Sequence, residues 1–250
     1  MKKLLVVFLL YPFLAVSQIN PKGFTIEGKL DGFTDGTKIS LYKNGEQTEW
    51  LSTTLQKGKF VFKESVAEPI LCYVVIEKMP TAAEVYVENA VISVKGNKSS
   101  PGKYEVSGSK SHKEFTEFVT VFLPVAQQLN SLAGVINNTM PGAERDSLLT
   151  VYTATQQKLQ NEIDKFINAK PASYVSAFLL NVTYRFNEDV VMLENRFNKL
   201  DEKIRNSQTG QQLSAFIAKS KIGAVGTMAL DFTQPDTSGN PVSLSSFRGK

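Results

Sequence analysis

The stretch Ile222–Lys250, IGAVGTMALDFTQPDTSGNPVSLSSFRGK, begins where a helical pattern ends, and it governs how the rest of the chain is interpreted. Asp231-Phe232-Thr233 and Pro241-Val242-Ser243-Leu244 are short β-favouring runs, separated by the turn-forming cluster Asp236–Asn240. This order predicts a β-hairpin. Isolated hairpins are marginally stable in water, so we expect this tail to be poorly ordered by itself.

The same stretch resembles the opening of thioredoxin-like domains of the TlpA/ResA and AhpC/TSA type. That opening reads G-x-x-A-x-D/F-F, followed by D-x-x-G-x-P-V-x-L-S-x-F-x-G-K. The matching positions are Gly226, Ala229, Asp231, Phe232, Gly239, Pro241, Val242, Leu244, Ser245, Phe247, Gly249 and Lys250. The resemblance implies the first strands of a thioredoxin-like domain over residues 222–250.

In that family a redox-active Cys-x-x-Cys pair follows the Gly-Lys on a strand-to-helix turn. Here the only cysteine is Cys72, far away in the chain. The resemblance therefore implies the accessory front part of an exported thiol–disulfide oxidoreductase, with a Cys-x-x-Cys encoded after Lys250. The complete protein would exchange thiols and disulfides with client proteins through a mixed disulfide. The 250-residue chain by itself should be inactive.

Two alternatives remain open. The chain is a non-catalytic binding or scaffold module of the cell envelope, with a C-terminal stretch that no longer serves redox chemistry. Or it is the front part of a peroxiredoxin-like antioxidant protein, which shares this opening and places a single peroxidatic cysteine further downstream.

The N-terminus has the order of a signal peptide. Lys2 and Lys3 form a positive region, Leu4–Leu14 is mostly apolar, and Ala15-Val16-Ser17 is a small-residue cleavage site before Gln18. Residues 1–17 are therefore expected to be removed on export. Together with this pattern, the family resemblance implies the periplasm or envelope of a Gram-negative bacterium. No other apolar run approaches the roughly 20 residues that cross a bilayer.

The composition is that of a folded protein without a nucleic-acid partner. Hydrophobic residues make up 42% and charged residues 21% of the chain. The net charge is +4, of which Lys2 and Lys3 supply two units, and no basic run is present. We expect client proteins as partners through the further domain, contact with a membrane that is peripheral at most, and a homodimer as an open alternative.

Residues 18–108 carry a β pattern of short alternating runs separated by turn signals, which predicts an antiparallel sandwich or barrel. Asn44-Gly45 indicates a tight hairpin. The apolar runs Ile70–Glu77 and Glu84–Val94 predict strands buried on both faces. The runs IEGKLDGFTDGTKISLYKNG and GKFVFKESVAEP also resemble the β-rich domain that precedes thioredoxin-like domains in Bacteroidetes envelope proteins.

Residues 109–221 change to a helical period, which makes the chain an α+β protein. Ser109 or Ser111 would cap the first helix, with Glu114 completing a capping box after Ser111 and Pro124 kinking or interrupting it. The other expected helices cover Ala143–Ala169, a segment starting at Pro171, Glu188–Ile204 and Gln211–Lys219. The serines after Pro171 and the stretch SQTGQQL around Gly210 resemble the helical insert of the same envelope proteins.

No residue of this chain is expected to be catalytic, to bind a cofactor or to ligate a metal. Cys72 lies in an apolar strand, where a thiol is inert. The single histidine, His112, has no evident nucleophile or ligand partner. The acidic pairs Glu144 with Asp146, Glu188 with Asp189, and Asp201 with Glu202 are read as solvated charges near helix starts.

Overall fold

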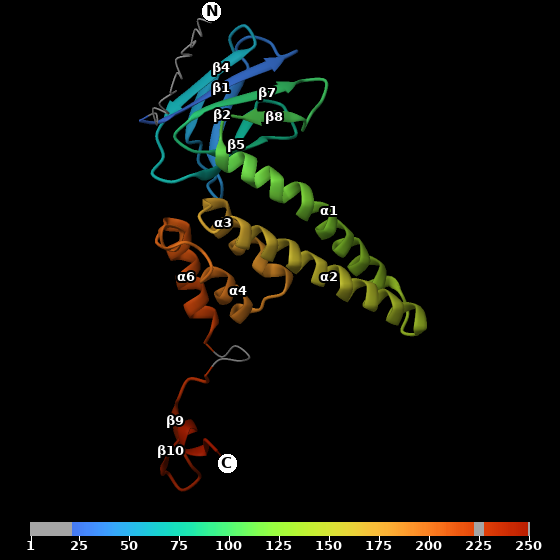
Figure 1. Cartoon of the computed structure of the whole chain (residues 1–250), viewed down its shortest axis with the longest axis vertical. Helices are drawn as coiled ribbons and strands as arrows, with labels where there is room; N and C mark the ends of the chain where they lie inside the picture. Colours follow the sequence, from blue (N-terminus) through green and yellow to red (C-terminus); the bar gives the residue numbers. More distant parts are fainter. Residues whose placement is uncertain (1–21, 223–227, 250) are drawn as a thin grey trace, which may run out of the picture.

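The computed structural model describes residues 22–222 and 228–249 and has three parts (Figure 1). A β-sandwich is followed by a helical segment and then by a small hairpin. The expected signal peptide over residues 1–17, and the motif positions Gly226 and Lys250, lie outside the described residues. The α+β fold predicted from the sequence is confirmed.

The sandwich consists of two four-stranded sheets with the orders β4-β1-β7-β8 and β3-β2-β5-β6. The strands are β1 (Phe24–Asp31), β2 (Lys38–Lys43), β3 (Leu51–Thr54), β4 (Lys59–Glu64), β5 (Ile70–Ile76), β6 (Ala83–Val87), β7 (Val91–Asn97) and β8 (Tyr104–Ser107). The pairings are antiparallel as predicted, except that β1 and β7 run parallel. This exception follows from the route of the chain, which crosses between the sheets before β7.

Alternation along the strands builds the core between the two sheets. In β1 the side chains of Phe24, Ile26 and Leu30 are buried, whereas Glu27 is exposed. They meet side chains of the opposite sheet such as Ile39, which is fully buried. Removal of each such apolar side chain from water contributes roughly 1.5–3 kcal/mol, so the period-two pattern fixes which face of each sheet turns inward.

The run Glu84–Val94 is not the single strand that its apolar pattern predicts. It is divided into β6, at the edge of one sheet, and β7, inside the other. Between them the Asn89 side chain accepts a hydrogen bond from Val66 N (3.0 Å) and donates one to Val66 O (2.8 Å). These tertiary bonds hold the chain where it changes sheets.

The connection after Asn44-Gly45 is longer than the predicted tight hairpin. β2 and β3 do pair, but their ladder begins only at Leu41 and Leu51. Gly45 has a positive φ of 82°, and Glu46 N donates to Lys43 O (3.1 Å), so a turn forms at the expected place. The remaining residues up to Trp50 extend the loop.

The helical segment contains two long antiparallel helices and several shorter ones. They are α1 (Lys110–Asn138), α2 (Ala143–Ala169), α3 (Tyr174–Thr183), the 3-10 turn η1 (Tyr184–Phe186), α4 (Val190–Phe197), α5 (Glu202–Arg205) and α6 (Gln208–Ser220). Figure 1 shows the hairpin of α1 and α2 reaching well beyond the sandwich and the smaller helices.

Three helix predictions need correction. Pro124 does not interrupt α1, and a kink there stays a prediction. The residue lies on the exposed side of the continuous helix, where water can bond the carbonyl that the proline leaves unpaired. The helix expected over Glu188–Ile204 is two helices, because α4 ends at Phe197 and the chain turns before α5 begins at Glu202. The third helix starts at Tyr174, after a turn that contains Pro171.

The helical segment packs on the outer face of the sheet that contains β5 and β6. Leu71 and Tyr86 point away from the sandwich core and join a cluster with Phe115 and other helical residues. The ring of Tyr86 lies 5.9 Å from that of Phe115 and 6.1 Å from that of Phe178, measured between centroids. β5 is thus buried on both faces, as its sequence predicts, and sandwich and helices share one apolar interface.

α1 is also the one helix of the described residues that is long and apolar enough to cross a membrane, by length and composition alone. This differs from the expectation that no apolar run after Leu14 has that length. Core helices of soluble proteins pass the same test, and α1 packs along α2 through residues such as Val125, Leu129 and Leu159.

The C-terminal part forms the predicted hairpin, of β9 (Thr233–Pro235) and β10 (Pro241–Ser243), followed by the turn η2 (Leu244–Phe247). β9 begins two residues later than predicted, although Leu244 N still donates to Phe232 O (2.9 Å). Figure 1 shows this hairpin standing apart from the helices. Its poor order stays a prediction.

Candidate functional site

Cys72, the only thiol, lies in the sandwich core. It is fully buried in β5 beside other apolar side chains of the two sheets. Burial raises the pKa of the Cys72 thiol to about 12, because the thiolate loses its hydration in apolar surroundings. Since the thiolate is the reactive species, Cys72 is a packing residue.

His112 lies in the first turn of α1 and joins the helical segment to the sandwich. Its Nδ1 accepts a hydrogen bond from the backbone N–H of Tyr86 in β6 (3.3 Å), and its Nε2 lies 3.3 Å from Thr116 Oγ1. Burial lowers the pKa of His112, which favours the neutral ring that this acceptor role requires. Sequence reasoning left His112 without a partner, because Tyr86 is brought to it only by the fold.

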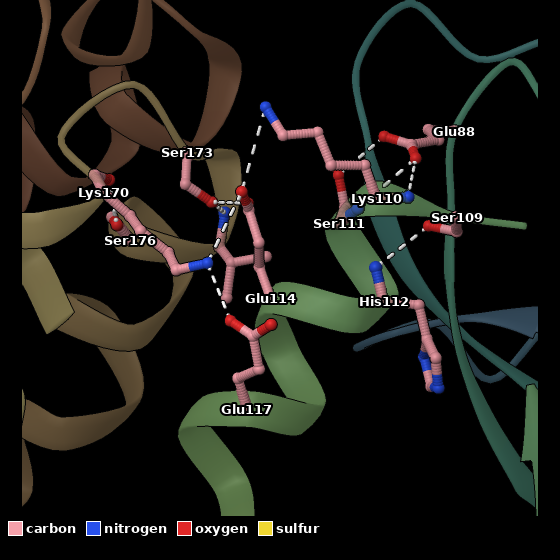
Figure 2. A network of polar contacts seen from close by, with 11 residues as sticks. Glu88, Ser109, Lys110, Ser111, His112, Glu114, Glu117, Lys170, Ser173 and Ser176 are labelled. Atoms are coloured by element: carbon pink, nitrogen blue, oxygen red, sulfur yellow. Dashed lines mark hydrogen bonds and ion pairs between the residues drawn. The ribbon is translucent and has the colours of Figure 1, made fainter. Parts of the chain in front are cut away.

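The start of α1 is held by its own N-cap residue and by a carboxylate from the β6–β7 connection, both shown in Figure 2. Ser109 is the N-cap, and its Oγ accepts from His112 N (2.9 Å). Glu88, from the β6–β7 connection, accepts from Lys110 N, from Ser111 N (3.3 Å) and from Ser111 Oγ (2.7 Å). A carboxylate at this position satisfies orphan N–H groups and complements the positive end of the helix dipole.

Glu114 does not form the capping box expected with Ser111. Its carboxylate accepts from Ser173 Oγ (2.6 Å) and lies 3.8 Å from Lys170 Nζ. Lys170 also pairs with Glu117 (2.8 Å), and this hydrogen bond lowers the pKa of the Glu117 carboxyl. Figure 2 shows these groups facing each other across the gap between α1 and the α2–α3 turn, so they fasten the two together.

The acidic pairs singled out in the sequence lie at helix starts and are not brought together. Glu144 and Asp146 are exposed in the first turn of α2, and Asp189 caps α4 by accepting from Met192 N (2.9 Å). Asp201 and Glu202 begin α5. Among residues 22–222 and 228–249 no group of three His, Cys, Asp or Glu side chains is placed to hold a metal ion.

Two cavities follow the junction of β8 and α1, and together we call them the crevice. The larger, about 740 Å³, lies between residues 106–109 and the first three turns of α1. The other, about 630 Å³, lies between β8, the start of β6 and the same helix. Val106, His112 and Thr116 border both cavities. No sequence motif marks the crevice. The larger cavity lies where β8 leads into α1, within residues 106–121, and the other also needs residues 81–84 from the start of β6.

The hairpin gives physical roles to several of the motif positions. Asp236 Oδ1 accepts from Asn240 N and Ser238 N, both at 2.8 Å, and these bonds, chiefly those to Asn240, lower the pKa of Asp236. Gly239 has a φ of 85°, a conformation that favours glycine. Asp231 accepts from Ser245 N (2.8 Å), which ties η2 to the start of the hairpin. The motif residues therefore build the turn itself.

Residues 24–115 match the family model described as a domain of unknown function, DUF4369. The matched region spans the sandwich and the first turns of α1, and so contains the walls of the crevice as far as Phe115. No curated protein and no solved structure matches the chain.

Proposed function

We propose that this chain is the accessory part of an exported thiol–disulfide oxidoreductase of the TlpA/ResA-like kind. On this view residues 228–249 are the first hairpin of a thioredoxin-like domain whose Cys-x-x-Cys follows Lys250. The sandwich and helices are a platform that carries this domain and places its clients.

The observation that carries the proposal is the exposed apolar surface of the hairpin. Met228, Leu230 and Phe232 are 79%, 63% and 54% exposed, and Phe247 is 56% exposed. Apolar side chains gathered on so small an element normally pack against further structure. Additional strands and helices of a thioredoxin-like domain would cover them, which agrees with the motif that these residues carry.

The state of Cys72 agrees with a redox centre located outside the described residues. A thiol buried in the sandwich and shifted to a pKa of about 12 does not attack disulfides near neutral pH. The chemistry would then belong to the further domain, and the described part would contribute binding, orientation or spacing.

The test begins with the gene sequence beyond codon 250 and continues with an insulin-reduction assay. The extended protein should reduce insulin, whereas the 250-residue chain and its Cys72→Ser variant should show none above background. Turnover by the 250-residue chain that survives Cys72→Ser would overturn the proposal. A downstream single peroxidatic cysteine with peroxide turnover would instead identify a peroxiredoxin-like protein.

A non-catalytic envelope module is the second candidate. The crevice favours it, because cavities of about 740 and 630 Å³ lie beside β8, which ends its sheet in the described part of the chain, and such cavities can bind a partner without any redox centre. A coding sequence without downstream cysteines, together with ligand binding at the crevice, would favour this candidate over the first.

A further inference from the structure

We propose that the crevice binds an extended peptide with basic and apolar side chains, which adds as a strand to the free edge of β8. This inference goes beyond the proposed redox assignment and holds with or without a thioredoxin-like domain.

The first argument is the unpaired edge of β8. In the described part of the chain, β8 pairs with β7 on one side and forms the end of its sheet on the other. An exposed edge presents backbone N–H and C=O groups that an incoming strand can pair with. β6 ends the other sheet, but the N–H of Tyr86 there is already bonded to His112. β8 is therefore the better template.

The second argument is the course of the cavities. Three consecutive residues of β8, Tyr104, Glu105 and Val106, border the cavity of about 630 Å³. Successive side chains of a strand point to opposite faces, so a cavity bordered by all three runs along the edge of the strand. Phe115 and Val119 form the apolar wall on α1. The space follows the direction that a paired peptide would take.

The third argument is charge. The charged residues that border this cavity are Glu84 and Glu105, and among the described residues neither has an ion-pair partner within 4.0 Å. Glu105 has Lys95 as its cross-strand neighbour, but the two do not form a salt bridge. The larger cavity is bordered by one charged residue of each sign, Lys113 and Glu117, and Glu117 is paired with Lys170. The two carboxylates therefore favour a cationic peptide at this cavity.

The chemistry of recognition follows from these three features. Backbone pairing with β8 would give affinity with little dependence on sequence, and alternate apolar side chains would enter the space beside Phe115 and Val119. Lysine or arginine residues of the peptide would lie near Glu84 and Glu105. Such a site fits extended segments of unfolded exported proteins, and it would bring them to the platform before any redox step.

The experiment uses the 250-residue chain and a short capped peptide of alternating valine and lysine, labelled for fluorescence anisotropy. The matched peptide replaces lysine by glutamate. The lysine peptide should bind and the glutamate peptide should bind at least about tenfold more weakly. An N-methylated lysine peptide, which cannot pair with β8, should also lose binding.

Two variants place the site. Thr116→Trp fills the border of both cavities from an exposed helix position and should abolish binding, with the fold checked by circular dichroism. Glu84→Lys with Glu105→Lys should weaken binding of the lysine peptide and strengthen that of the glutamate peptide. Glu27→Lys, an exposed charge reversal on β1, is the control and should change neither.

The proposal is overturned if the lysine peptide does not bind up to about 1 mM, the weak end of specific affinities. It is equally overturned if Thr116→Trp leaves binding intact, or if Glu27→Lys weakens binding as much as the double reversal. Binding of anionic vesicles in place of the peptide would identify a lipid surface instead. None of these results depends on the insulin assay, so the failure of one proposal is distinguishable from that of the other.

Discussion

Arg196 shows how a single buried charge holds two helices together. It is 5% exposed in α4, and its guanidinium bonds both carboxylate oxygens of Asp164 (3.0 Å each) and the side chain of Gln160 in α2 (2.8 Å). Arg196→Ala should lower the free energy of unfolding by about 2–4 kcal/mol, because it leaves buried polar groups unpaired. Urea denaturation measures this, and Lys158→Ala, at an exposed position of α2, should change stability by under about 0.5 kcal/mol. A small effect of Arg196→Ala would contradict the argument.

His112 should make stability depend on pH. Burial lowers its folded pKa below the ordinary 6.5, so the unfolded chain takes up the proton first as the pH falls. The free energy of unfolding should therefore decline from pH 6.5 downward and level off, for this group, below the folded pKa. His112→Asn keeps an acceptor for Tyr86 N but does not titrate, so the difference between the two unfolding profiles isolates the histidine. Parallel profiles through this range would show that His112 is not responsible.

For single residues, the sequence predicted that Cys72 is buried, but it did not predict the hydrogen bond that gives His112 its role. An apolar strand around a cysteine already indicates burial, because the neighbours along the strand share its environment. The partner of His112 is the backbone of Tyr86, 26 positions earlier. Glu114 likewise bonds Ser173 rather than the local capping position, and no local pattern encodes such contacts.

At the scale of elements, α5 and α6 pack closely at Gly210. A Cβ added there would lie 2.1 Å from Ile204 O and 2.4 Å from Arg205 O, so the backbones would have to separate. Gly210→Ala should destabilise the protein by about 2 kcal/mol or more. Gly134→Ala, in α1 with open space around it, should instead stabilise by about 0.5–1 kcal/mol. Thermal unfolding of the two variants measures both effects. If Gly210→Ala and Gly134→Ala change stability equally, the close packing of α5 and α6 at Gly210 is refuted.

Glu88 holds the start of α1 from outside the helix. Glu88→Ala should cost about 1–2 kcal/mol, since it removes a carboxylate bonded to two backbone N–H groups and to Ser111 Oγ at the positive end of the helix. Glu144→Ala, an exposed carboxylate in the first turn of α2, is the comparison and should cost at most about 0.5 kcal/mol. Chemical denaturation measures the stability of both variants. If Glu88→Ala and Glu144→Ala lose similar stability, the interaction of the carboxylate with the helix dipole matters and the hydrogen bonds of Glu88 do not.

Most elements could be predicted where the pattern is local and repeated. Residues 143–169 form the helix expected from their apolar spacing, and the alternation in β1 gives the buried face observed. The element predictions that were wrong failed because contacts between distant parts of the chain override the local pattern. Asn89 is bonded to Val66 where the chain changes sheets. The helix expected over Glu188–Ile204 is interrupted after Phe197, where Asp201 N donates to Pro171 O (3.1 Å).

At the scale of the whole molecule, the hairpin should be separable from the sandwich and helices. Deletion of residues 223–250 should leave the melting temperature of the remainder within about 2 °C, because the packing shared by sandwich and helices lies within residues 22–222. The deletion should also reduce binding of the dye ANS, since the exposed Met228, Leu230, Phe232 and Phe247 are removed.

Circular dichroism and ANS fluorescence of the two chains measure both effects. Leu71→Ala in the full chain is the contrasting variant, because it lies in the interface between sandwich and helices. It should lower the melting temperature clearly, at a cost of about 2–5 kcal/mol. If the deletion lowers the melting temperature as much as Leu71→Ala does, the hairpin must pack against the sandwich or the helices and stabilise them.

The sequence alone determined the α+β class, the division between strands and helices, the buried thiol and the C-terminal hairpin. Each depends on residues close together in the chain, through period, turn chemistry or an apolar neighbourhood. The tertiary structure alone decided the parallel β1–β7 pairing, the role of His112, the bonds of Glu88 and the crevice beside β8. These depend on groups from separate elements meeting in space, and burial and hydrogen bonding act between them only once the chain has folded.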